Sequence, residues 1–205
     1  FALYGFPESH AISFAILAYA SAWLKVHRPA EFYCGLFNNQ PMGFYSPATL
    51  AQDARRRGLR ILPVCVARSA WKCAVEDDRT LRLGFASVRG LPSGSAARLL
   101  AEREKRPFAS PEDLAARAGL HRDELRTLAS IGALNALANH RRDALWRVEG
   151  SPREHDLFSG APAETSPLAP MDPLERVAAD FRGTGLTVGR HPMAHLRGSL
   201  PARVP

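Results

Sequence analysis

The chain has 205 residues, with 27 Lys and Arg, 20 Asp and Glu, and a formal net charge of +7 at pH 7. That length suffices for one large domain or two small ones with an apolar core. The longest apolar run, Ala11 to Leu24, has 14 residues and is interrupted by serines and a tyrosine. It is too short and too polar to span a bilayer and predicts a buried helix, so we expect no membrane partner.

The cysteines point to a reducing compartment. Cys34, Cys65 and Cys73 are odd in number and have no Cys-x-x-Cys spacing. This pattern favours a cytoplasmic protein and argues against a zinc site. Because the chain begins at Phe1 rather than Met, we expect it to be an interior piece of a longer protein.

Basic charge is concentrated in one part of the chain. Residues 49–110 carry thirteen basic and six acidic side chains, whereas the segments before and after them each carry equal numbers of the two. The whole excess of +7 therefore lies in this segment. A localised basic surface predicts a polyanionic partner such as nucleic acid, with a solvated basic face as the alternative.

Two helices are predicted at the N-terminal end. Ser9 can cap a long helix that runs to His27 and is ended by Pro29. A second helix spans Pro29 to Asn38, with the proline in its first turn. The long helix is apolar on almost every side, so we expect a larger body to surround it.

Residues 4–47 read YGFPESHAISFAILAYASAWLKVHRPAEFYCGLFNNQPMGFYSP. They resemble the end of the fingers domain of bacterial C-family DNA polymerases, the polymerase III alpha-subunit type, and the final QPMGFYSP resembles the error-prone branch. The resemblance implies that Ser9, His10 and Lys25 approach the incoming deoxynucleoside triphosphate. There, positive charge would offset that of the polyphosphate. On an ordinary helix, Ser9 would be a cap and Lys25 a snorkelling end residue.

A short amphipathic helix and a β-ribbon come next. Ser46 can cap a helix that starts at Pro47 and ends near Gly58. The arginines 55–57 at its end either contact phosphate or balance the helix dipole. Residues 60–64 are predicted to be extended, and 71–76 and 80–83 to form two strands. The family has the same order, with fingers, a small ribbon and then a tandem helix-hairpin-helix domain.

Residues 83–103 predict a hairpin that leads into a helix. Gly90 and Gly94 permit a positive φ, and Ser93 or Ser95 can cap the helix. Free N–H groups would then point outward beside Arg89, an arrangement that binds phosphate. The segment resembles a helix-hairpin-helix, which binds DNA without sequence preference, although Pro92 stands where such motifs usually have a second glycine and removes one donor. An ordinary packing corner is the alternative. The implied DNA-binding residues are Arg89, Gly90, Leu91, Ser93, Gly94, Ser95 and Arg98.

A second hairpin is predicted further on. Ser110 starts a helix that stops at Gly119, and another helix runs from Asp123 to Ile131. The turn at residues 131–134 resembles the second, degenerate hairpin of the family, and we expect it to pack against the first because no charge excess surrounds it. Weaker DNA-binding candidates in this region are Arg122, Arg126, Arg141 and Arg142.

Residues 149–170 are rich in Gly, Ser, Pro and Ala and predict a flexible linker. Within it, residues 154–158 resemble the pentapeptide by which bacterial polymerases bind the sliding clamp. A segment that folds back on the domain is the alternative. The implied clamp-binding residues are Glu154, which replaces the family's Gln, Asp156, Leu157 and Phe158.

The C-terminal part contains one more predicted helix. Asp172 can cap it, with Pro173 in its first turn, and it ends at Gly183. Residues 184–193 resemble the junction before the family's nucleic-acid-binding barrel domain. His191 and His195 have a metal-like spacing, but no third ligand is near, so we predict no metal site.

Polymerisation chemistry is not predicted for this chain alone. It needs paired carboxylates that hold two metal ions, and no Asp-x-Asp pattern lies on a predicted strand. In the family these acids, with their Mg²⁺, belong to a palm domain that would precede Phe1. No phosphate-binding Gly-x-x-x-x-Gly-Lys loop occurs either. We therefore expect a chain that binds DNA but does not extend a primer, with no cofactor of its own.

Together these patterns predict a mainly α fold with a small β-ribbon. The expected parts are the end of the fingers (1–48), the ribbon with the tandem helix-hairpin-helix domain (49–148), the linker (149–170) and a helix with the junction to a barrel domain (171–205). The predicted function is that of a fragment of an error-prone DNA-directed DNA polymerase, for translesion synthesis and DNA repair. It would bind duplex DNA and the incoming nucleotide, with the sliding clamp and other translesion-synthesis proteins as further partners. The alternatives are a stand-alone helix-hairpin-helix repair accessory protein and a protein-docking module.

Overall fold

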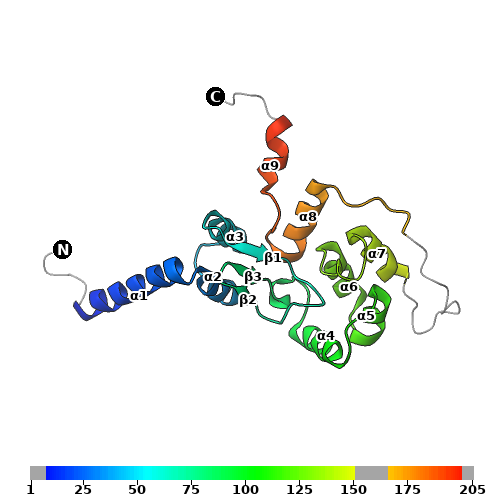
Figure 1. The fold of residues 1–205 in the computed structure, drawn as a ribbon, viewed down its shortest axis with the longest axis horizontal. Coiled ribbons are helices and arrows are strands. Elements are labelled where there is room, and N and C mark those ends of the chain that lie inside the picture. The colour runs from blue at the N-terminus through cyan, green and yellow to red at the C-terminus, as the bar shows by residue number, and fades with distance from the viewer. Residues whose placement is uncertain (1–7, 151–165, 200–205) are drawn as a thin grey trace.

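The computed structural model describes residues 8–150 and 166–199. The fold is mainly α with one small sheet, as the sequence predicted. Figure 1 shows α1 extending away from a body in which α2, α3 and the sheet lie at one side and α4 to α7 at the other. The helices are α1 (Glu8–His27), α2 (Pro29–Asn38), α3 (Pro47–Arg56), α4 (Ser93–Lys105), α5 (Pro111–Ala118), α6 (Arg122–Ser130), α7 (Arg141–Gly150), α8 (Pro173–Thr184) and α9 (Pro192–Leu196), with short 3-10 helices η1 (Phe85–Ser87) and η2 (Arg197–Ser199).

Three helices begin at the caps that the sequence predicted. The Ser46 hydroxyl accepts a hydrogen bond from the Thr49 amide at 3.2 Å, and the Ser110 hydroxyl accepts one from Asp113 at 3.2 Å. A carboxylate oxygen of Asp172 accepts from the Glu175 amide at 2.8 Å. These caps satisfy first-turn amides that otherwise have no partner, which is why the starts are readable locally.

The sheet contains one pairing that the sequence did not predict. Its strands are β1 (Arg60–Leu62), β2 (Ala74–Asp77) and β3 (Thr80–Arg82), in the order β1-β3-β2. β2 and β3 form the predicted antiparallel ribbon, although β2 begins at Ala74 rather than residue 71. β1 joins β3 in parallel, with Ile61 opposite Leu81. All three residues of β3 are buried because this strand lies at the centre of the sheet.

A continuous apolar core joins the two sides of the body. Tyr33 and Phe37 of α2 belong to it, together with Leu81 of β3, Leu99 of α4 and Leu128 of α6. Residues on both sides of the predicted boundary at 48 and 49 therefore contribute to the same core.

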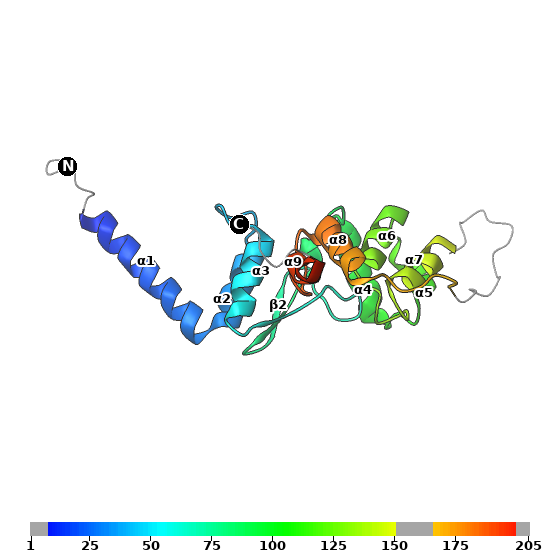
Figure 2. The same cartoon turned by 90° about the horizontal axis from the view of Figure 1, so that it is seen from above.

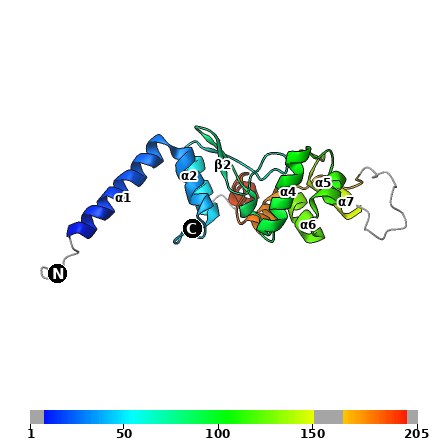
Figure 3. The same cartoon turned by 90° about the horizontal axis from the view of Figure 1, so that it is seen from below.

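The long helix α1 is exposed within this chain, contrary to the prediction of a buried helix. None of its residues is buried, and Leu17 and Tyr19 are 62% and 74% exposed. In all three views α1 points away from the body (Figures 1, 2 and 3). Its contacts with the body are made near its C-terminal end, with α2 and, through Lys25, with Asp53 of α3. No described helix is long and apolar enough to cross a membrane.

Candidate nucleic-acid interface

The predicted first hairpin forms an exposed loop on buried anchors. Gly90 adopts a φ of +76°, which only glycine accepts without strain, and both Arg89 and Gly90 are exposed. Val88 and Leu91 on either side are 4% and 6% exposed. The loop is therefore fixed in the core at both sides while its tip faces outward.

Leu91 supports this loop rather than offering a group to a ligand. Its side chain is in the core, and its amide donates to the Val88 carbonyl at 3.4 Å. The first half of the motif is also shorter than a full helix, since Phe85 to Ser87 form only the 3-10 turn η1.

The first turn of α4 leaves backbone donors available. Pro92 is the N-cap residue and has no N–H to donate, and the Ala96 amide donates to the Pro92 carbonyl at 3.1 Å. The predicted side-chain caps by Ser93 or Ser95 are absent, because Ser93 already lies inside the helix and no side chain caps its start. Among the described residues, the amides of Ser93, Gly94 and Ser95 have no acceptor. Uncapped amides at a helix N-terminus form an arrangement that accepts an anion.

Ser95 contributes to packing through its side chain. It is 4% exposed, and its hydroxyl donates to a carboxylate oxygen of Glu124 at 2.7 Å. The other oxygen of Glu124 accepts from the His121 amide at 2.7 Å. This buried carboxylate therefore connects the start of α4 with the start of α6, a role that the sequence pattern did not predict.

Two arginines border the exposed turn. A Cβ on Gly94 would lie 4.0 Å from Nη1 of Arg98, so this guanidinium flanks the amides of the first turn. Arg98 donates to the Ser95 hydroxyl and to the Gly119 carbonyl, both at 3.0 Å, which fixes its position. On the other side, Arg89 donates from Nη1 to the Phe181 carbonyl at 3.3 Å. Neither guanidinium has a carboxylate partner among the described residues.

The second hairpin is buried where the first is exposed. All four residues from Ile131 to Leu134 are buried, and Gly132 has a φ of +79°. The Gly132 and Ala133 amides donate to carbonyls of α6, and the Ala133 carbonyl accepts from the Val66 amide at 3.0 Å. The backbone N–H and C=O groups of the second hairpin are thus hydrogen-bonded within the protein.

The weaker DNA candidates are held by carboxylates. Arg141 pairs with Asp180 at 2.7 Å, with side chains only 13% and 11% exposed. Arg142 pairs with Glu175, and Arg122 and Arg126 both pair with Glu149. In the other basic cluster, Arg57 lies 3.6 Å from Asp53 and Arg55 donates to the Gly189 carbonyl.

The three residues predicted to face a nucleotide are not brought together. Ser9 and His10 lie in the first turn of α1, where the Ser9 carbonyl accepts from the Ser13 hydroxyl at 2.8 Å and the rings of His10 and Phe14 are 4.5 Å apart. Lys25 follows fifteen residues after His10, about 22 Å further along the helix.

Lys25 is engaged with α3. Its ammonium group lies 2.7 Å from the Asp53 carboxylate, which also accepts a hydrogen bond from the Tyr33 hydroxyl. The hydrogen bond from Lys25, followed by that from Tyr33, holds the pKa of Asp53 below its ordinary value. Burial, with the adjacent Asp53, raises the pKa of Tyr33. Sequence reasoning missed Asp53, because nothing in its local pattern indicates a partner on α1.

The clamp-like peptide with Glu154, Asp156, Leu157 and Phe158 lies outside the described residues. Within the described residues, no cluster of three or more His, Cys, Asp or Glu side chains could hold a metal ion.

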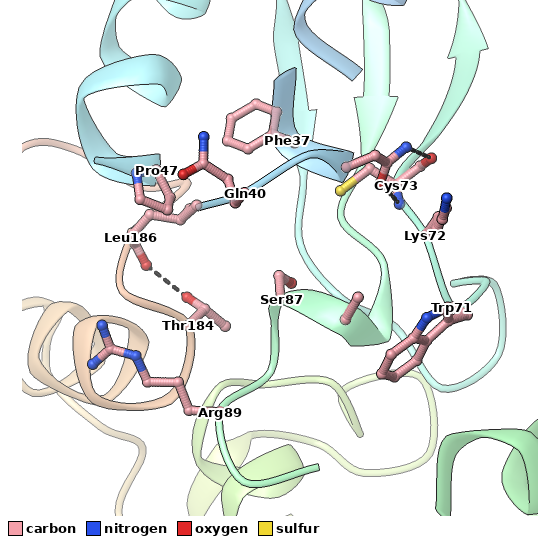
Figure 4. Close-up of a pocket in the computed structure, with 12 residues that line it drawn as sticks. Phe37, Gln40, Pro47, Trp71, Lys72, Cys73, Ser87, Arg89, Thr184 and Leu186 are labelled. Atoms are coloured by element: carbon pink, nitrogen blue, oxygen red, sulfur yellow. Dashed lines mark hydrogen bonds between the residues drawn. The ribbon is translucent and has the colours of Figure 1, made fainter. Parts of the chain in front are cut away.

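Arg89 also borders a cavity on one side of the hairpin. This cavity has a volume of about 270 Å³ and lies between the end of α2, the segment around Trp71 and the turn after α8. Figure 4 shows Arg89 at its edge, directed toward the ribbon of α8, and the 2.9 Å hydrogen bond from the Thr184 hydroxyl to the Leu186 carbonyl. The sequence pattern did not predict that α8 would lie beside the hairpin.

This chain is similar to a known motif family and to several known proteins. Residues 58–144 match the family model described as a helix-hairpin-helix motif. The error-prone DNA polymerase of Azoarcus sp. strain BH72 is 50% identical over 211 aligned positions, which cover 98% of this chain and 20% of the relative. The enzymes of the same name from Bordetella parapertussis and Dechloromonas aromatica are 49% and 50% identical, over 99% of this chain and 20% of each relative.

The chain thus spans about a fifth of the length of the curated relatives that it matches. The identity extends along almost the entire chain and includes both the N-terminal helices and the hairpins. Over almost its whole length the chain is therefore similar to one segment of proteins named error-prone DNA polymerase, and residues 58–144 within it match the helix-hairpin-helix motif.

Proposed function

We propose that this chain is the part of an error-prone DNA polymerase that holds duplex DNA by its backbone phosphates. The observation that carries the proposal is the contrast between the two hairpins. The first exposes Arg89, Gly90 and the uncapped amides of α4, whereas the second is buried and uses its amides internally. Only the first presents donors to a ligand.

The donors of the first hairpin suit phosphate rather than bases. Backbone amides at a helix N-terminus and arginine guanidinium groups bind phosphate oxygens, and such contacts carry no direct sequence information. The Ser93 and Gly94 amides are proposed to cradle one phosphate, with Arg98 beside them and Arg89 across the loop. The Ser95 amide contributes on the same turn, and Leu91 keeps the loop in place. Binding is therefore expected to be similar for unrelated sequences.

The test is duplex binding by the 205-residue chain at several salt concentrations. Two labelled duplexes of unrelated sequence are titrated, and fluorescence anisotropy gives the dissociation constants. The expected result is a similar affinity for both duplexes that falls steeply with added NaCl, because each neutralised phosphate releases counterions. An affinity that does not change with salt would contradict backbone binding.

The activity of the whole polymerase follows as a proposal from the relatives. They are named error-prone DNA polymerases, and a DNA-directed polymerase acting in translesion synthesis fits the chain. Its Mg²⁺ and catalytic carboxylates are proposed to lie in the part of the relatives that this chain does not cover. Sliding-clamp binding by residues 154–158 is proposed on the sequence resemblance alone. Clamp binding without duplex binding would instead favour a protein-docking module.

Nucleotide contacts are proposed for α1. Ser9 and His10 are exposed at one end of the helix, which supports contact with a ligand held by the rest of the polymerase. Lys25 at the other end would have to exchange Asp53 for a phosphate group. The two ends are therefore proposed to serve different parts of the nucleotide site.

A further inference from the structure

The end of α8 is inserted between the two hairpins. The Gly183 carbonyl accepts a hydrogen bond from the Arg89 amide of the first hairpin at 2.7 Å. A Cβ on Gly183 would lie 2.3 Å from Cγ2 of Ile131 in the second hairpin, so only glycine allows this approach. α8 is thus fixed against the helix-hairpin-helix body, although it lies outside the matched residues 58–144.

A basic cavity of about 250 Å³ lies at this junction. Arg89 lines it from the first hairpin, Arg126 and Ser130 from α6, and Arg182 from α8. Three of its lining residues are arginines and none is Asp or Glu. The Ser130 hydroxyl has no hydrogen-bond partner among the described residues and adds a further polar group.

The three arginines are not equally available. Arg126 is held by Glu149 and by Asp123, the latter at 2.9 Å, so its charge is offset. Arg89 and Arg182 have no carboxylate partner among the described residues. Each makes a single long contact through its guanidinium, to Phe181 O at 3.3 Å and to Ala178 O at 3.4 Å. A guanidinium has five N–H donors, so both keep most of theirs for a ligand.

The helix dipole explains in part why Arg182 and Arg89 lie near the C-terminal end of α8. Cations near a helix C-terminus are favoured by the helix dipole. Here, however, the terminal carbonyls already have amide donors, since Phe181 O accepts from the Gly185 amide at 3.0 Å and Gly183 O from Arg89. The helix dipole also does not explain why both guanidinium groups line the same cavity, which has no Asp or Glu in its lining. An anionic occupant explains that arrangement.

We propose that this cavity binds a second phosphate of the DNA backbone, with Arg182 of α8 and Arg89 of the first hairpin as its ligands. The inference rests on the proposed duplex binding and extends the DNA-binding surface to α8. Paired guanidinium donors match phosphate oxygens in number and geometry. Arg89 then links the two proposed phosphate sites. Its loop borders the first site at the start of α4, and its side chain lines the cavity that forms the second.

The test compares Arg182→Ala with Arg176→Ala, which removes the same charge from another position on α8 that does not line the cavity. Both are made in the 205-residue chain, together with Arg89→Ala, and a labelled 20-bp duplex is titrated at several NaCl concentrations by anisotropy. We expect Arg182→Ala to weaken binding about tenfold and to reduce the slope of log K against log [NaCl] by about 0.9, the value for one lost phosphate contact. Arg176→Ala should change affinity less than about twofold, and Arg182→Lys should recover part of the loss.

The outcomes separate this inference from the proposed function. If the wild type binds and Arg89→Ala is weakened while Arg182→Ala behaves like Arg176→Ala, the second phosphate site is wrong and the first hairpin stands. If the wild type does not bind the duplex, both proposals are wrong. A loss that is confined to Arg182→Ala and Arg89→Ala, with unchanged thermal unfolding, supports both.

Discussion

Glu124 is a buried residue of α6 that connects this helix with the start of α4. It is 5% exposed and accepts hydrogen bonds from the Ser95 hydroxyl and the His121 amide. A buried carboxylate with two donors both caps α6 and satisfies a buried hydroxyl. The turn that presents the α4 amides therefore depends on a contact 29 residues away in sequence.

Replacing Glu124 tests this role. Glu124→Ala removes the cap of α6 and leaves the Ser95 hydroxyl unsatisfied, so we expect the free energy of unfolding to fall by about 2–3 kcal/mol. Urea denaturation measures the change. Asp123→Ala on the same helical turn is the matched control, since its side chain is 90% exposed. Equal effects of the two variants would show that Glu124 does not connect the helices.

Asp53 gives the chain a pH-dependent contact. Its folded-state pKa is depressed below the ordinary 3.8, chiefly by the hydrogen bond from Lys25. A depressed carboxyl pKa contributes stability that is complete above the unfolded value and is lost as the pH falls through the folded value. The Lys25–Asp53 pair should therefore stabilise the joint between α1 and α3 near neutral pH and stop doing so in acid below pH 3.8.

NMR titration of the Asp53 carboxyl tests this assignment. In Lys25→Met its pKa should rise toward the ordinary value, because the largest contribution to the depression is gone. Arg28→Met, which removes a cation that lies 3.8 Å from Glu31 instead, should leave the Asp53 titration unchanged. An unaltered Asp53 pKa in Lys25→Met would contradict the pairing.

At the scale of elements, α8 is held by a buried ion pair as well as by Gly183. Asp180 of α8 pairs with Arg141 of α7 at 2.7 Å and accepts from the Thr187 hydroxyl at 2.7 Å. Arg141 also donates to the Ser130 and Arg176 carbonyls at 3.2 Å each. This network attaches the segment after residue 166 to the second hairpin.

Breaking the pair should be costly. Asp180→Asn leaves the Arg141 charge largely buried without a counterion, and we expect a loss of about 3 kcal/mol in unfolding free energy. Because two carbonyl groups would still accept hydrogen bonds from Arg141, we expect a loss of stability near the lower end of the range for broken buried ion pairs. Glu175→Gln, which weakens the more exposed pair with Arg142 but can still cap α8, should cost less. Thermal unfolding curves that coincide for the two variants would contradict this account.

The sequence predicted features that neighbouring residues determine and missed features that distant contacts determine. The starts of α3, α5 and α8 follow from a polar cap with a proline next to it, so Ser46, Ser110 and Asp172 were read correctly. The predicted side-chain cap of α4 was wrong, because Pro92 is the N-cap residue and Ser93 already lies inside the helix, while the Ser95 hydroxyl has a distant partner in Glu124 that no pattern within α4 reveals. The parallel pairing of β1 with β3 is likewise set by long-range packing rather than by a turn.

The same limit applies to the candidate site. The composition of the first hairpin indicated phosphate binding, and its exposed tip at Gly90 is consistent with that prediction. Arg141 and Arg142 had the same charge as Arg89 in the sequence, and only the structure separates them through their carboxylate partners. Arg182 was not singled out at all, because its relation to the hairpin depends on Gly183 fitting against Ile131.

On the scale of the whole molecule, exposed apolar surface and exposed basic surface lie in different places. α1 exposes large apolar side chains, including Phe14, Ile16 and Tyr19, at the end far from the hairpins. Apolar surface of this kind is typical of contact with further protein. The exposed hairpin and the basic cavity, for which DNA contacts are proposed, lie in the body instead. The surface proposed to bind DNA is thus separate from the exposed apolar surface of α1.

Charge reversal at Arg89 compared with Arg142 tests the central claim most directly. Both variants remove one arginine from the described surface, but Arg142 is already bound to Glu175 and to the Ala169 carbonyl. With a labelled duplex at constant salt, Arg89→Glu should weaken binding by about tenfold or more, because an acid would then face the phosphate. Arg142→Glu should change affinity by less than about threefold while the thermal midpoints show that both variants are folded. Equal losses of affinity would contradict the assignment of DNA binding to the first hairpin.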